Sequence, residues 1–182
     1  MVCFHRMRKD QRGSVLVEMA FILPILVTMM LAGVELSRYV LLQQKLDAIA
    51  ITTADLVSQR EQISSATVDQ IFAAAGHVIA PFTFGADGIV MVTSVSASGG
   101  NGPRVDWQRS GGGMLSASST IGTPGGVATL PAGFQVRDGE NAIISEVFYN
   151  YSPLLQTAFF TSTQTYHRAL FRPRFGDLAQ LQ

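Results

Sequence analysis

The sequence predicts an α+β protein with one long N-terminal membrane-spanning helix, a shorter helix and a small antiparallel sheet of three or four strands. Three observations lead to this prediction. An apolar stretch of lipid-spanning length lies near the N-terminus, a stretch with helical periodicity follows it, and several later segments alternate apolar with polar residues. The 182 residues are enough for this anchor and one modest domain.

The predicted membrane helix comprises residues 14–35. Crossing about 30 Å of hydrocarbon takes roughly 20 mostly apolar residues, and the stretch from Ser14 to Val34 supplies them. Glu18 is the only charged residue in that stretch. Because a carboxylate is costly in lipid, Glu18 either reaches back to the cytoplasmic headgroups or has a partner within the membrane. Pro24 removes one internal hydrogen bond and should kink the helix.

The charge distribution predicts which side of the membrane each part occupies. Residues 1–13 carry a net charge of +3 and the remaining residues a net charge of −3, which gives the formal net charge of zero. A basic leader beside an apolar stretch stays in the cytoplasm, so the chain from about residue 36 onward is expected on the outer side. This outer part offers no basic patch for nucleic acid. The single cysteine, Cys3, lies in the leader and allows no intrachain disulfide.

The junction between the leader and the apolar stretch resembles the processing site of type IV prepilins. Gly13 closes the basic leader, and Glu18 follows it at the head of the apolar helix. The resemblance implies that a prepilin peptidase cuts between Gly13 and Ser14 on the cytoplasmic face. The new Ser14 ammonium of one subunit would then meet Glu18 of a neighbour, because a paired carboxylate costs much less in lipid than an isolated one and also fixes the register between helices.

Two other interpretations of the apolar stretch are open from these residues. A secretory signal would need a small-x-small cleavage site, but Leu31-Ala32-Gly33 and Met30-Leu31-Ala32 each begin with a large residue. An uncleaved signal anchor would retain residues 1–13.

Both ends of the chain resemble the TadE-like family, the minor pseudopilins of the Tad (tight adherence, Flp-type) pilus system. The N-terminal similarity runs from Arg12 to Pro24 and continues at Gly33–Arg38; Met19 stands where the family has an aromatic residue, and Leu36-Ser37 where it has Phe-Gly. The C-terminal similarity covers Glu146–Leu155 and Arg168–Arg174.

The resemblance implies a pilin-like fold, an inner-membrane location with the domain in the periplasm, and a structural role in assembling a Tad pilus for surface attachment. The implied partners are the prepilin peptidase, other pilin and pseudopilin subunits, and the pilus assembly platform. It implies no cofactor, no metal and no catalytic residue.

Helical periodicity continues beyond the membrane through residues 36–60. Apolar or small residues recur there at three- and four-residue spacing, namely Leu42, Leu46, Ile49, Ala50, Thr53 and Val57. A helix from Ser14 to about Gln59 would be roughly 70 Å long. Glu35 and Arg38 lie one turn apart at the outer membrane edge and form either a solvated pair or a contact to a neighbouring subunit. With Pro24, they are the candidate contacts between helices.

The outer domain, residues 61–182, is expected to hold one helix and the sheet. Thr67-Val68-Asp69-Gln70 has the capping-box pattern and would begin a helix that ends before Pro81. Alternation predicts strands over residues 88–96, 103–108, 142–151 and 161–171, the last two forming an antiparallel pair. Residues 97–102 and 109–126 are rich in glycine and serine, which is typical of loops.

The sequence contains no motif that indicates catalysis. It has no nucleotide-binding loop, no His-Glu-x-x-His and no Gly-x-Ser-x-Gly, and His77 and His167 are isolated. We therefore expect a structural protein and not an enzyme. The competing hypotheses are an uncleaved single-pass membrane protein whose outer domain binds a ligand or an envelope protein, and an enzyme with an unrecognised site.

Overall fold

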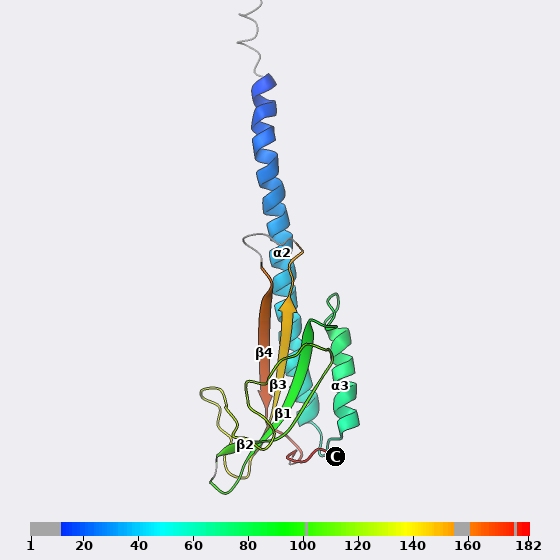
Figure 1. Ribbon diagram of the computed structural model, residues 1–182, viewed down its shortest axis with the longest axis vertical. Coiled ribbons are helices and arrows are strands. Elements are labelled where there is room, and N and C mark those ends of the chain that lie inside the picture. The colour runs from blue at the N-terminus through cyan, green and yellow to red at the C-terminus, as the bar shows by residue number, and fades with distance from the viewer. Residues whose placement is uncertain (1–11, 101, 155–160, 177) are drawn as a thin grey trace, which may run out of the picture. The chain divides into compact units, whose positions relative to one another are not determined.

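The structure, a computed structural model, describes residues 12–100, 102–154, 161–176 and 178–182. Its elements in chain order are α2 (Arg12–Ser58), α3 (Ser65–Val78), β1 (Gly88–Ala97), β2 (Pro103–Gly111), β3 (Asn141–Tyr151) and β4 (Thr163–Phe171) (Figure 1). The predicted α+β class is confirmed. The chain divides into two compact units, residues 1–40 and residues 41–182, and α2 runs through both. Cys3 and most of the basic leader lie outside the described residues.

The helix α2 confirms the prediction of one continuous helix that extends beyond the membrane-spanning stretch. It has 47 residues, which corresponds to about 70 Å at 1.5 Å per residue. Pro24 lies inside it, and the kink expected at this residue stays a prediction. The Thr28 and Ser37 hydroxyls donate to the carbonyls of Ile25 and Gly33, each at 2.8 Å. The helix thus satisfies the Thr28 hydroxyl internally, as the predicted lipid environment requires. The Ser37 hydroxyl, just beyond the predicted span, is satisfied in the same way.

In the unit of residues 41–182, the stripe predicted from helical spacing is the buried face of α2. Its members are each at most 2% exposed: Leu42, Leu46, Ile49, Ala50, Thr53 and Val57. The intervening residues Gln44 and Asp47 are exposed. This amphipathic division explains why the helix continues outside lipid, because burial of one face stabilises a helix more than its propensity does.

The second helix begins one turn earlier than predicted. Its N-cap is Ser64, whose hydroxyl accepts a hydrogen bond from the Thr67 N–H at 3.3 Å, so Thr67 is not the cap. The helix buries one face, formed by Val68, Ile71, Phe72 and Ala75. The Ser64 hydroxyl also lies 3.0 Å from the Thr67 hydroxyl, so Thr67 is the partner of the cap within the first turn.

The four strands form one antiparallel sheet in the order β2-β1-β3-β4. The predicted β3–β4 pair is confirmed, with Glu146 opposite Arg168 and Phe148 opposite Tyr166. The predicted start of β2 at Pro103 is confirmed, but its predicted end at Gln108 is wrong, because the strand extends to Gly111 and residues 109–111 are not loop. A Cβ on Gly111 would lie 2.4 Å from Phe72 Cδ2, so this glycine permits close packing of β2 on α3 and does not mark a turn.

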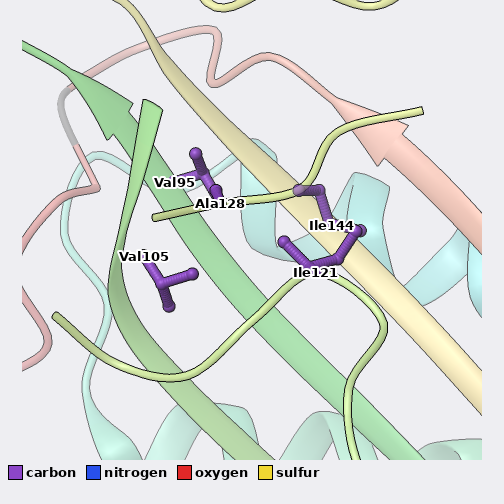
Figure 2. Close-up of a cluster of buried hydrophobic side chains, with 5 residues drawn as sticks. All are labelled: Val95, Val105, Ile121, Ala128 and Ile144. Carbon is purple, nitrogen blue, oxygen red and sulfur yellow. The ribbon is translucent and has the colours of Figure 1, made fainter. Parts of the chain in front are cut away.

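Both faces of the sheet are covered within this unit. Nearly every residue of β3 is buried, irrespective of which face it points to. The helices lie on one face, and the irregular connection 112–140 between β2 and β3 crosses the other (Figure 1). Figure 2 shows the apolar cluster on that second face, where Ile121 and Ala128 of the connection pack against Val95, Val105 and Ile144 of the strands.

Candidate functional site

The residues predicted for processing and pairing lie at the start of α2. Gly13 and Ser14 belong to its first turn, and Gly13 is exposed with open space where a Cβ would stand. Glu18 is also exposed and follows Ser14 by one helical turn. The structure therefore brings Gly13, Ser14 and Glu18 close together along one helix.

The part of α2 around Glu18 has an apolar surface on every side. The large apolar side chains from Val15 to Val34 are 37–73% exposed. α2 is long and apolar enough to cross a membrane, and its most apolar stretch is not buried against any part of the structure. Water is a poor solvent for such a surface, so lipid or other apolar helices must cover it.

Glu35 and Arg38 lie beyond this apolar surface. Glu35 is only 2% exposed and Arg38 is half-buried. A carboxylate this buried is expected to be hydrogen-bonded or paired. Whether the two residues contact a neighbouring subunit stays a prediction.

Polar side chains on the sheet and the C-terminal segment hold the residue 41–58 part of α2. His167 on β4 contacts Gln43 through Nε2, and its Nδ1 lies 3.5 Å from Asp47 Oδ1. Arg174 donates to Asp55 at 3.3 Å, about two helical turns after Asp47. The isolated histidine of the last strand is thus a structural residue at the helix–sheet contact.

Sequence reasoning missed a buried carboxylate at the centre of β3. Glu146 is fully buried, and its Oε1 accepts hydrogen bonds from the Thr120 N–H at 2.9 Å, the Thr120 hydroxyl at 2.6 Å and the Tyr166 hydroxyl at 2.9 Å. The Ser119 hydroxyl donates to Oε2. Glu146 lies between Ile144 and Phe148 on the same face of the strand, and a carboxylate within such an apolar pattern was the signal available in the sequence.

The surroundings of Glu146 also affect Tyr166. Burial raises the pKa of the Tyr166 phenol above its ordinary value, and the Glu146 carboxylate adds to this effect, whereas the hydrogen bond with Thr120 opposes it. The phenol therefore stays protonated at neutral pH and donates to the carboxylate. The site joins β3, β4 and the connection 112–140, which makes it a structural clamp.

The described residues do not assemble a metal site. Among them, no group of three or more His, Cys, Asp or Glu side chains is placed to hold a metal ion. A polar pocket is lined by Ser96, Ser98, Gly102, Arg104 and Asp106. The Asp106 carboxylate already accepts hydrogen bonds from Ser94 at 3.2 Å and Ser96 at 2.6 Å. The carboxylate that lines this pocket is therefore already hydrogen-bonded within the sheet.

Comparison with known families gives a match at the N-terminal end. Residues 13–55 match the family described as TadE-like protein. The match begins at Gly13 and ends near the C-terminus of α2, so it covers the exposed apolar stretch and most of the amphipathic stripe. Comparison with curated proteins and with solved structures found no significant similarity. Residues 13–55 are therefore similar to the TadE-like family of the Tad pilus system.

Proposed function

We propose that this protein is a minor pseudopilin that is processed by a prepilin peptidase and takes part in assembling a Tad pilus from the inner membrane. It acts through packing of its helix against other pilin subunits and the assembly platform, and not through catalysis. The domain of residues 41–182 lies in the periplasm in this proposal, because the basic leader favours a cytoplasmic N-terminus.

The exposed apolar part of α2 is the observation that carries the proposal. Side chains that are 37–73% exposed over this length need an apolar cover. Lipid supplies this cover before assembly, and helices of other subunits supply it afterwards. The TadE-like match begins at Gly13, where cleavage would give a chain that starts directly with this helix.

Glu18 gives the packing a defined register in this proposal. Cleavage after Gly13 creates a positive charge at Ser14, one turn before Glu18 in the same helix. In a bundle of parallel helices, the Glu18 carboxylate of one subunit lies near the Ser14 ammonium of a neighbour when the two helices are shifted by about one turn. Two charges in low dielectric attract strongly, so this shift is favoured over other alignments.

Processing is tested by the N-terminal sequence and intact mass of the protein isolated from native membranes. We expect a chain that begins at Ser14, because Gly13 and the basic leader match a prepilin site. A Gly13→Leu variant should retain Met1, and a Val17→Ala variant should be cleaved normally. A wild-type chain that begins at Met1 would instead support an uncleaved anchored protein with an outer binding domain, and a start beyond Ala32 would indicate a secretory signal.

Replacement of Glu18 tests the pairing separately from the cleavage. Glu18→Ala should be synthesised, inserted and cleaved, but its recovery with other pilus subunits after crosslinking should fall about tenfold or more, because one buried charge loses its partner. Glu18→Asp keeps the charge and should recover part of the loss. Normal incorporation of Glu18→Ala would exclude the pairing mechanism while leaving the processing result intact.

A further inference from the structure

The outer edge of β4 is an open backbone edge in the described part of the structure. β4 spans Thr163–Phe171 and pairs with β3 on one side, while no other described segment pairs with it on the other side (Figure 1). Natural proteins usually protect such an edge with proline, a bulge, several charges or a covering segment. β4 contains no proline or glycine, its register with β3 is regular, and its only formally charged residue is Arg168.

The opposite edge of the sheet is covered at its start, from Pro103 to Val105. β2 begins with Pro103, and the connection that follows it returns to cover its outer backbone. The Gly125 N–H donates to the Val105 carbonyl at 2.7 Å, the Val105 N–H donates to Gly126 at 3.0 Å, and the Ala128 N–H donates to Pro103 at 2.9 Å. The start of β2 is therefore covered by the connection, whereas no described segment pairs with the outer side of β4.

The accessible strand is also held firmly in place. Tyr166 is tied to Glu146, His167 to Gln43, and the Gln164 amide donates to Asn150 Oδ1 at 3.1 Å. These bonds fix β4 from both faces of the sheet. A strand that is already ordered loses little conformational entropy when another strand pairs with it, which favours binding.

The charge along β4 indicates which kind of strand fits. The strand has no acidic residue, and Arg168 is exposed near its centre. Arg172 and Arg174 follow it, and these two have intramolecular partners, Glu140 and Asp55. Opposite charges on neighbouring strands stabilise the pair, and like charges destabilise it. We propose that the outer edge of β4 binds an extended acidic segment of another protein, which adds a fifth strand with a carboxylate beside Arg168.

The proposal can be tested with the full-length protein in detergent micelles and a synthetic peptide. The probe is a capped nine-residue peptide of alternating threonine and valine with glutamate at its centre. We expect binding at or below about 1 mM by calorimetry, together with slower hydrogen exchange of the amides in Thr163–Ala169. The same peptide N-methylated at alternate residues should lose binding for one of the two sets of positions and keep it for the other, because only one edge of a strand pairs.

A double-mutant cycle tests the charge pair. Arg168→Gln should weaken binding of the glutamate peptide about three- to fivefold and leave binding of a glutamine-centred peptide unchanged. Arg104→Gln, on the protected edge, is the matched control and should change neither affinity. The proposal is overturned if no peptide binds at about 1 mM, if protection appears elsewhere, or if Arg168→Gln affects both peptides equally. It is also overturned if concentration-dependent protection of β4 without peptide shows that a second copy occupies the edge.

Discussion

Replacing Glu146 with alanine should lower the free energy of unfolding of the domain of residues 41–182 by about 3 kcal/mol. The carboxylate is fully buried, and four hydrogen bonds from Ser119, Thr120 and Tyr166 end on it. Hydrogen bonds to a charged acceptor contribute about 1.5–3 kcal/mol each in favourable cases, and their donors become unsatisfied when the acceptor is removed. Water entering beside the connection offsets part of this loss, which keeps the total well below the sum.

The measurement is thermal unfolding of the full chain in micelles, combined with limited proteolysis. We expect a decrease in Tm of about 10 °C and faster cleavage within residues 112–140, because Ser119 and Thr120 lose their attachment to the sheet. Glu146→Gln keeps the shape of the side chain, but its NH2 group replaces an acceptor oxygen and faces groups that are themselves donors. Its decrease in Tm should therefore lie between those of wild type and Glu146→Ala. Glu61→Ala, at an exposed position, is the control. An unchanged Tm and unchanged cleavage for Glu146→Ala would show that the clamp does not hold the connection.

Replacing Leu46 with alanine should destabilise the same domain by about 2–5 kcal/mol. Leu46 is fully buried on the stripe of α2 that faces away from solvent, and its removal leaves a cavity as well as losing apolar contact. The hydrogen bond from His167 to Gln43 lies one turn earlier in the helix, which limits how far α2 can move to fill that cavity.

Leu41 provides a matched control for Leu46, because it lies on the same helix and is 38% exposed. Leu41→Ala should change the free energy of unfolding by about 0.5 kcal/mol or less, as is usual for surface positions. Both variants are compared by chemical denaturation followed through the single tryptophan, Trp107, whose indole N–H donates to the Leu178 carbonyl at 2.7 Å. Equal effects of the two substitutions would contradict the assignment of the buried face.

The repeating elements could be predicted from the sequence because their signals are local. Helical spacing identifies the face of α2 that contains Leu42 and Leu46, and alternation identifies all four strands. The boundaries were less secure. Ser64 and Thr67 are both suitable caps, and the structure places Ser64 at the N-cap, where its hydroxyl accepts from the Thr67 N–H. The prediction of a loop at Gly111 was wrong. The reason for a glycine there is its close contact with Phe72, which is far away in the chain and cannot be inferred from local sequence.

The functional features likewise comprise one that could be predicted from the sequence and one that could not. The Gly13–Glu18 pattern and the apolar stretch are continuous in the sequence, so they could be recognised there, and the TadE-like match covers the same residues. The Glu146 clamp could not be recognised in advance. Its donors come from Ser119, Thr120 and Tyr166, two of which belong to a segment without periodicity.

The sequence by itself determined the membrane-length helix, its amphipathic continuation, the α+β class and the position of the cleavage pattern. Each of these depends on the spacing of side chains along a single segment, which a helix or strand repeats at a fixed period. Only the tertiary structure decided the strand order β2-β1-β3-β4, the burial of Glu146, the covered edge at β2 and the accessible edge at β4. These features depend on which distant segments meet, and that outcome is set by packing of the whole domain.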